Sequence, residues 1–514
     1  MKPRPDGHPP DPAAPRRVAL SVVFTGASQG VSMIAGGVLA ILVAALFGST
    51  AQTDGFFLAY GVYSLLVLVA QSTRTAIPAR LLETETLFGA FDRYLAGAAL
   101  LFLASGVALL GFAGPLATLL TGSDAGPAHA ATAESLRILW PAVGGQLFAA
   151  LAAAMLGVAG DFTRAALAYA AGGLATIGAF LALHGPFGIR ALPVAVVIGT
   201  LVSVCPLAHG LVRIGWRPAP AGSGALGAAR IILVSSTAGA LSQVLFVVSL
   251  SVAARVGSGD ATLYSYAYFA LGLLVALVSS SVSAVLAAPL AATWDRDPRS
   301  LRPVDDDVFR TGLVVLAPIL AAAALLGRDL AGAVLGKFTH TEIAAVWRAF
   351  LILSPSAVTA LAIAIPLVAL FALGRYRAIA LVAPPIVALH VALSVVAAVA
   401  GSLVLVAAAA TVGSFAITGA LLGILYGREA GRAVVHLVRE LARVALPAAL
   451  AFGLPALLLL VRGGAAVSSA AWLLGLVLYA GAVAGLLPAH RELALRLLRA
   501  LGTRPRALEP SAPS

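Results

Sequence analysis

The chain has 514 residues, of which 61% are hydrophobic and 11% charged, and its mean hydropathy is +1.01. Soluble globular proteins carry about 25% charged residues, so this composition indicates a protein whose surface is solvated mainly by lipid. The formal net charge of +12 argues for basic cytoplasmic loops rather than for a nucleic-acid partner. The single cysteine, Cys205, excludes an intrachain disulfide and a cysteine metal cluster.

Residues 1–17 are rich in proline and carry four basic residues, which predicts a disordered cytoplasmic N-terminus. Apolar segments of membrane-spanning length follow, separated by Gly, Pro and charged breaks. No small-residue cleavage site follows the first segment, so we expect an anchor helix there rather than a removed signal peptide. The fourteen predicted spans cover residues 18–46, 55–80, 94–120, 134–158, 163–183, 191–212, 229–254, 262–291, 309–326, 345–372, 378–399, 401–426, 444–461 and 467–487. The sequence therefore predicts an all-α polytopic membrane protein.

The placement of basic residues predicts the orientation of these spans. With the N-terminus inside, 26 of the 33 Lys and Arg residues fall on the cytoplasmic side and 7 on the external side. An omitted or an invented span would scramble this alternation. We therefore expect a multi-pass protein of the plasma (inner) membrane, surrounded by membrane lipids, with both termini cytoplasmic.

An internal repeat predicts how the spans are grouped. Residues 38–81 align without a gap on residues 247–290, with 13 identities in 44 positions. Chance would give about 4 or 5 identities in a chain of this composition. Six predicted spans separate the two copies, so both copies have the same orientation, and an axis along the membrane normal relates them.

We therefore predict two six-helix lobes and two further C-terminal helices. The predicted division of the chain is a disordered N-terminus at 1–17, an N-lobe at 18–214, a cytoplasmic linker at 215–228, a C-lobe at 229–427, a basic cytoplasmic linker at 428–443, two helices at 444–487 and a basic cytoplasmic tail at 488–514.

The sequence lacks the motifs of the common enzyme classes. It contains no G-x-x-x-x-G-K-[ST] phosphate loop, no metalloprotease His/Glu pair and no G-x-S-x-G elbow. Between the predicted spans, no stretch exceeds about 30 residues, which leaves no room for a catalytic domain. We expect a transporter without a cofactor, not an enzyme.

A motif across the first two spans carries a family resemblance. It covers residues 44–60 and includes Phe47-Gly48, Thr53-Asp54 and Phe56-Phe57. It resembles the first helix pair of the MurJ/MviN-type lipid II flippases of the multidrug/oligosaccharidyl-lipid/polysaccharide (MOP) exporter superfamily. Ser265-Tyr-Ala-Tyr268 is similar to helix 8 of that family. The resemblance implies a flippase that moves an anionic polyprenyl-pyrophosphate precursor of peptidoglycan from the inner to the outer leaflet by alternating access.

The chain departs from that family at its cavity arginines. Met33 and Leu39 stand where members that flip peptidoglycan precursor have arginines in helix 1, and Tyr268 or Phe269 stands at the arginine of helix 8. In helix 2 the run Ser64-Leu-Leu-Val-Leu68 replaces Asn-Leu-Leu-Arg-Arg. In the family those arginines are thought to hold the pyrophosphate, which suits the forked guanidinium.

Two alternatives to a lipid II-like substrate therefore stay open. One is a different lipid-linked polysaccharide, or a drug or small molecule moved by an antiporter of the same fold. The other is a transport-inactive scaffold that recruits proteins of cell-envelope synthesis through its cytoplasmic tails.

Polar residues of the second span are candidates for substrate contact. Arg74 follows Gln71, Ser72 and Thr73 in an otherwise apolar segment, and it either faces a cavity or snorkels to the cytoplasmic interface. Asp54 at the start of this span is either a helix N-cap or a gate contact or cation site between the lobes.

The second half supplies the remaining candidates. Asp260 occupies the loop equivalent to that of Asp54, and Arg255 either reaches the substrate or caps the C-terminus of the seventh span. Gln243 lines a polar lumen or serves helix packing. His390, in the middle of the eleventh span, is either a packing histidine or a proton site.

The orientation is testable with reporter fusions. We expect fusions after Arg217 and Arg428 to report a cytoplasmic location and fusions after Asp124 and Lys337 an external one, because the basic residues accumulate on the first side. Paired reporters that are active on opposite sides of the membrane measure this. A fusion after Asp297 should also report a cytoplasmic location, and an external signal there would remove the basis for two lobes of equal orientation.

Overall fold

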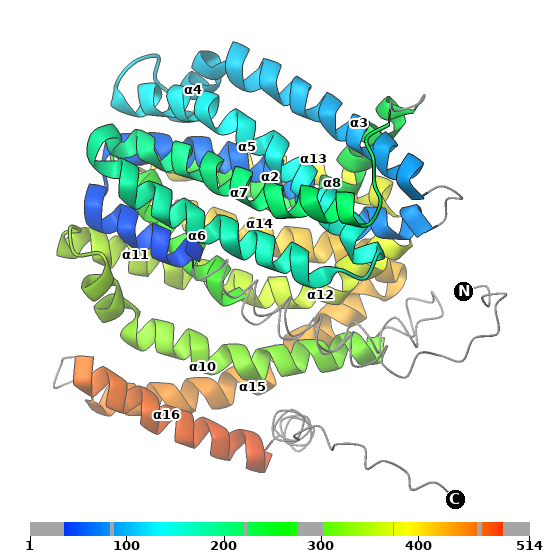
Figure 1. Ribbon diagram of the computed structural model, residues 1–514. Helices are drawn as coiled ribbons and strands as arrows, with labels where there is room; N and C mark the ends of the chain where they lie inside the picture. Colours follow the sequence, from blue (N-terminus) through cyan, green and yellow to red (C-terminus); the bar gives the residue numbers. More distant parts are fainter. Residues whose placement is uncertain are drawn as a thin grey trace, which may run out of the picture.

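The computed structural model describes residues 35–82, 87–219, 224–275, 302–373, 375–459 and 465–486. Long helices make up almost all of this part of the chain, which contains no β-strand, and they run roughly along one direction (Figure 1). The helices are Ala35–Phe47, α2 (Ala51–Leu82), α3 (Leu87–Gly106), the π-helical turn η1 (Val107–Gly111), α4 (Ala113–Thr121), α5 (Pro127–Val158), α6 (Phe162–Phe187), η2 (Gly188–Arg190), α7 (Ala191–Arg213), α8 (Ala225–Val256), a helix at 260–275, α10 (Arg302–Val334), α11 (His340–Leu353), α12 (Pro355–Ala372), α13 (Tyr376–Val399), α14 (Leu403–Tyr426), η3 (Gly427–Glu429), α15 (Ala430–Leu459) and α16 (Ala465–Leu486).

Each predicted span has a helical counterpart in the described part of the chain. Eight helical segments there are long and apolar enough to cross a membrane. Two of these, Thr163–Arg213 and Leu403–Leu457, each hold two helices joined by a short 3₁₀ turn. A third, His340–Leu367, is bent at the junction of α11 and α12. The bent α8, the two shorter apolar helices and the helix at 260–275 account for the remaining spans; residues 18–34 and 276–291 lie outside the described residues.

Two predicted segments have local structure that the sequence did not specify. The segment 428–443, predicted as a basic linker, is helical and forms η3 and the first half of α15. Buried Glu440 in this segment pairs with Arg310 of α10, with Nε and Oε2 3.0 Å apart, which anchors the segment on a neighbouring helix. The tenth span is two helices, because Pro355 has no N–H and begins a new helix after Leu353.

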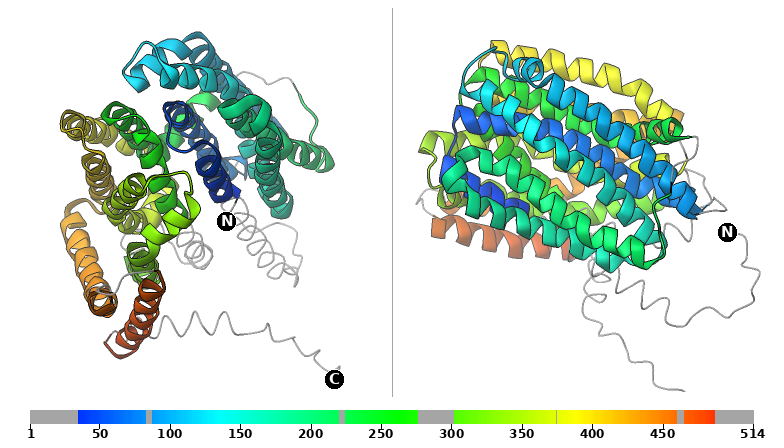
Figure 2. Two further views of the ribbon diagram at one scale, coloured as in Figure 1. Left: turned by 90° about the vertical axis from the view of Figure 1, so that its left-hand side faces the viewer. Right: turned by 45° about the horizontal axis from the view of Figure 1, so that its top comes forward.

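The helices form two groups and an appended pair. In the first group α5 packs against α2, α3 and α7, and α6 packs against α7. In the second group α14 packs against α11, α12 and α13, and α8 packs against α13. The two groups lie on opposite sides in Figure 2, and α15 and α16 lie beside α10 at the outer edge. These groups are the two predicted lobes and the C-terminal pair.

The two copies of the repeat meet across the lobe interface. Thr53 and Thr262, which are 209 positions apart, have their Oγ1 atoms 3.1 Å apart. Two further pairs follow at the same offset: the rings of Phe57 and Tyr266 are 5.6 Å apart, and those of Tyr60 and Phe269 are 6.1 Å apart. A residue touches its own repeat equivalent only beside a twofold axis. The axis therefore runs between α2 and the helix at 260–275, as a parallel repeat requires.

Small residues set the spacing of helices in the N-lobe. In α6 and α7, Thr176 lies over Gly199 and Ser203 lies over Gly172: a Cβ at either glycine would be 1.9 or 1.8 Å from the hydroxyl opposite. Each hydroxyl donates to a carbonyl of its own helix, at 3.0 Å for Thr176 and 3.1 Å for Ser203. The two helices are therefore in contact through their backbones, as small residues allow in membranes.

Gly199→Ala should destabilise the N-lobe, because its methyl group would overlap Thr176 and the carbonyl of Gly172. Overpacking of this kind costs about 1–3 kcal/mol. The control is Gly178→Ala on α6, where a Cβ meets nothing within 4 Å. Thermal unfolding in detergent measures both, and we expect a lower midpoint for Gly199→Ala alone. Equal midpoints would show that α6 and α7 can separate at no cost.

Candidate functional site

A cavity of about 910 Å³ lies between the two lobes. Its walls come from the helices Ala35–Phe47, α2, α5, α6 and α7 on one side and from the helix at 260–275, α10 and α11 on the other. Gly36 and Gly37 belong to the wall, and a Cβ at either would meet nothing within 4 Å, so close helix packing does not explain this pair. The volume is within the range of small-molecule sites.

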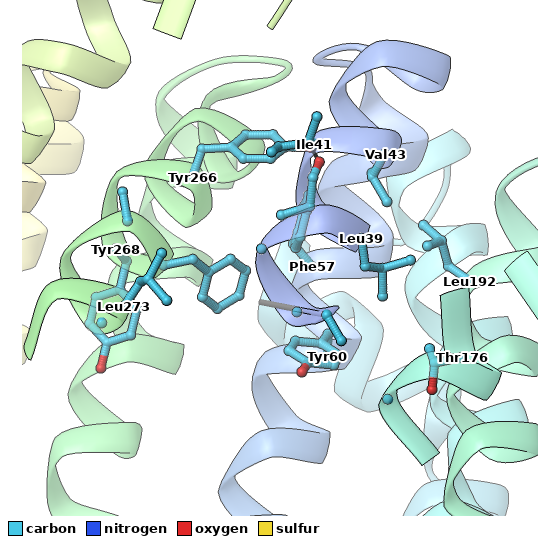
Figure 3. A pocket seen from close by; sticks show the side chains of 18 of the residues that line it. Leu39, Ile41, Val43, Phe57, Tyr60, Thr176, Leu192, Tyr266, Tyr268 and Leu273 are labelled. Atoms are coloured by element: carbon cyan, nitrogen blue, oxygen red, sulfur yellow. Dashed lines mark hydrogen bonds between the residues drawn. The ribbon is translucent and has the colours of Figure 1, made fainter. Parts of the chain in front are cut away.

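The wall of the cavity is aromatic and hydroxylic. Phe57 and Tyr60 of α2 face Tyr266, Tyr268 and Leu273 of the opposite lobe across this space (Figure 3). On the N-lobe side the polar lining residues are Gln71, Gln146, Thr176, Thr200 and Ser203. Aromatic faces and amide or hydroxyl groups together suit a ligand that is partly apolar and partly hydrogen-bonding.

Tyr63, which also lines the cavity, forms a cluster with Gln146 and Thr200 on the N-lobe wall. The Tyr63 hydroxyl lies beside Gln146 and Thr200, and Gln146 Nε2 donates to Thr200 Oγ1 at 3.4 Å. Among the lining residues that the structure describes, none is Asp, Glu, Lys, Arg or His. The described wall can therefore bind uncharged polar groups, and it offers no formal positive charge to an anion.

One end of the cavity is closed by contacts between the lobes. This end, predicted to be external, holds the turns at 48–50, 122–126, 257–259 and 335–339. Asp54 of α2 is 2% exposed and accepts three hydrogen bonds from the opposite lobe: from the Gly259 N–H at 2.6 Å, the Thr262 N–H at 2.8 Å and the Thr262 hydroxyl at 2.6 Å. Asp54 thus caps the N-terminus of the helix at 260–275, where exposed amides and the helix dipole favour a carboxylate.

Further contacts at the same end join the lobes. Lys337 donates to the carbonyl of Leu46 at 2.6 Å, and Ser49 donates to Glu342. Arg255 donates to the carbonyl of Leu119 at 2.6 Å. Each contact links a residue before 130 to one after 250, so this end opens only if they break.

The structure corrects one interpretation of Asp54. It is not the N-cap of its own helix, because Thr50 and Thr53 fill that role: each backbone N–H donates to the other hydroxyl, at 2.8 and 3.2 Å. Asp54 lies within the first turn of α2 and is free to cap the other lobe. Asp260 begins the helix at 260–275 and lies beside Gly257. Arg255 contacts a carbonyl of the opposite lobe, not the cavity.

The other predicted residues are spread over the bundle. Gln71 is exposed and lines the cavity. Ser72 and Arg74 lie on α2 just beyond it. Gln243 of α8 is buried and donates to the Ser64 hydroxyl of α2, so it joins the lobes. His390 is buried within the C-lobe, away from the lining of the cavity.

The sequence reasoning missed the aromatic wall and the cluster of Tyr63, Gln146 and Thr200. Four tyrosines and phenylalanines in α2 recur at helical spacing, at positions 56, 57, 60 and 63, and this stripe was the available signal. An aromatic stripe usually marks helix packing, so the sequence alone does not distinguish a packing stripe from the wall of a cavity. Among the described residues no group of three or more His, Cys, Asp or Glu is placed to hold a metal ion.

Two pseudosymmetric six-helix lobes around a central cavity that is closed at one end define the fold of a membrane transporter. The family model described as lipid II flippase MurJ matches residues 43–476, which is most of the chain. The protein therefore belongs to the MurJ family. That family consists of transporters rather than enzymes.

Solved structures show the same fold. The structure of a lipid II flippase MurJ in an inward closed conformation superposes with a TM-score of 0.74 at 14% identity, covering 93% of this chain and 99% of that one. A MOP superfamily transporter from Pyrococcus furiosus gives a TM-score of 0.59 at 17% identity, covering 81% and 96%. An inward-facing MATE family multidrug resistance transporter gives 0.61 at 16% identity, covering 82% and 98%. None of the curated proteins matches the chain in sequence.

Asp54→Asn should loosen the closed end, because the amide keeps one acceptor and places an N–H group against the donors of Gly259 and Thr262. A charge-assisted hydrogen bond contributes about 1.5–3 kcal/mol, so we expect amide exchange around Gly259 to accelerate about tenfold or more. Hydrogen–deuterium exchange mass spectrometry measures this. The control is Asp124→Asn, a change at an exposed turn of the same end. Unchanged exchange in Asp54→Asn would show that the cap does not hold the lobes.

Proposed function

We propose that this protein flips a lipid-linked cell-envelope precursor with a polyprenyl-pyrophosphate carrier, similar to lipid II, from the inner to the outer leaflet. Membership of the family described as lipid II flippase MurJ is the observation that carries this proposal. The interlobe cavity supports it, because a polar headgroup cannot cross hydrocarbon unaided and needs a polar path.

The two ends of the molecule suggest how the cycle works. Asp54, Lys337 and Arg255 close the predicted external end in this conformation, so the substrate enters from the predicted cytoplasmic side. Breaking these contacts and rocking the lobes apart at this end, where Thr53 meets Thr262, then opens the cavity outward. This is alternating access.

The headgroup and the pyrophosphate have different chemical needs. Sugar hydroxyls match the amide and hydroxyl groups of Gln71, Gln146 and Thr200, and sugar faces pack on tyrosine rings such as Tyr60. The pyrophosphate needs a cation, and Arg74 is our candidate. It stands three residues after Gln71 on α2, and residues three apart lie on one face of a helix.

Reconstitution tests the function directly. Vesicles containing the protein and a lipid-linked disaccharide with a labelled headgroup should expose the headgroup to an impermeant modifying enzyme faster than empty vesicles do. A dithionite-quenched phospholipid in the same vesicles controls for leakage and for unspecific scrambling. Equal rates with and without protein would favour the scaffold interpretation.

Arg74→Ala should slow translocation, and Arg74→Lys should slow it less, because lysine keeps the charge and loses the two-pronged hydrogen bonds. One charge-assisted hydrogen bond corresponds to about a tenfold change in rate. Rates are normalised to the amount of folded protein, and Arg80→Ala, on the same helix, is the control. Normal transport by Arg74→Ala would leave the pyrophosphate without its proposed partner.

A further inference from the structure

His390 joins three helices of the C-lobe from a fully buried position. It lies in α13 and is 0% exposed. Its Nδ1 atom is 3.1 Å from the carbonyl oxygen of Ala409 in α14, and its Nε2 atom is 3.0 Å from the carbonyl oxygen of Leu245 in α8. The imidazole ring is thus held between two main-chain acceptors on different helices.

The carbonyl oxygens of Ala409 and Leu245 together need two N–H donors, and a neutral imidazole ring has only one. A carbonyl oxygen only accepts, and a neutral imidazole has one N–H, so it can serve either Ala409 or Leu245 but not both. The imidazolium has two N–H groups and serves both. Ser249 Oγ, 3.1 Å from Nε2, can donate to that nitrogen when the ring is neutral. The site therefore provides partners for the ring in both protonation states.

The space for the ring is also specific. Gly413 of α14 faces it: a Cβ there would be 3.3 Å from His390 Nδ1 and 2.8 Å from a methyl group of Leu245. A side chain at this position would push the ring away from the Ala409 carbonyl. Because Gly413 has no side chain, α14 lies close enough for the hydrogen bond between His390 and the Ala409 carbonyl.

Polar groups connect this site to the cavity. Tyr264 neighbours Ser249, and its ring stacks on that of Tyr268, 6.3 Å away, which lines the cavity. The hydroxyl of Ser394, one helical turn after His390, is buried and has no hydrogen-bond partner within the described part of the chain. Buried hydroxyls without partners are uncommon and often mark a functional position.

No described carboxylate faces the ring to neutralise a bound proton. On α8 and α13 the charged residues lie near the helix ends. The titratable residue of α14 is Tyr426, at its end, and the titratable residue of the helix at 260–275 closest to the ring is Tyr264. The titratable residues of these elements are Arg230, Arg255, Asp260, Tyr264, Tyr266, Tyr268, Tyr376, Arg377 and Tyr426. A proton at His390 therefore adds an uncompensated positive charge inside the lobe, which favours its release when the lobe changes shape.

We propose that His390 is a proton-binding site that couples the movement of the substrate to a proton gradient. This inference rests on the transport function proposed above and names its coupling ion. A proton that enters from the cavity past Tyr264 binds the Nε2 lone pair, and the imidazolium then ties α8 and α14 to α13. Loss of the proton frees one of the two carbonyls and loosens one helix.

The first test follows the ring itself. Exchange of the imidazole C2 hydrogen, read by mass spectrometry from about pH 5 to pH 9, reports the titration of each histidine. We expect the His390 peptide to show a sigmoidal curve in this range. Ser249→Ala should move its midpoint to higher pH, because the change removes the donor that stabilises the neutral ring. A flat curve in both proteins would overturn the proposal without bearing on lipid transport.

The second test follows coupling. An imposed proton gradient of about two units should accelerate translocation by the native protein about tenfold, and His390→Gln should lose this response because an amide does not titrate. His209→Gln, an exposed site in α7, is the control and should respond normally. Intact acceleration in His390→Gln would overturn the proton site but leave the flippase function standing. If neither the native protein nor any variant moves lipid, the proposed flippase function is wrong. The exchange curve of the His390 peptide then still shows whether the proton site exists.

Discussion

The carboxylate of Asp54 accepts three hydrogen bonds from the first turn of a helix in the opposite lobe, and the closed end of the molecule depends on this contact. The helix at 260–275 begins there, so its first amides lose the carboxylate that caps them if the lobes part. The paired threonines beside it place the twofold axis at the same point. The contact between Asp54 and the helix at 260–275 therefore lies where the lobes meet at the closed end, and it must break before this end can open.

Below this contact the cavity divides its chemistry between the lobes. The N-lobe wall offers amides and hydroxyls, with Gln146 already hydrogen-bonded to Thr200, and the C-lobe wall offers the rings of Tyr266 and Tyr268. Groups fixed in advance lose little entropy when they bind a ligand. A charged wall would bind pyrophosphate more strongly but would also release it more slowly. The described lining favours recognition of the headgroup, with Arg74 proposed as the separate contact for phosphate.

The two lobes differ in how their helices are held together. In the N-lobe Gly172 and Gly199 bring α6 and α7 into close contact under Thr176 and Ser203, which leaves little space for either helix to shift against the other. In the C-lobe the ring of His390 holds α8, α13 and α14 by hydrogen bonds that depend on its protonation. We therefore expect the N-lobe to move as a unit and the C-lobe to be the part that changes internally during a cycle.

Hydropathy, basic residues and the 209-residue offset were enough to predict the spans and the two lobes related by an axis along the membrane normal, because membrane insertion and duplication leave direct traces in a sequence. The family resemblance of the segment around Asp54 was likewise visible. Only the tertiary structure showed that Asp54 caps another helix and that His390 faces two carbonyls. Main-chain amides and carbonyls are present at every residue, so a sequence cannot show which of them a buried side chain will meet. That choice is made when helices from distant parts of the chain pack together.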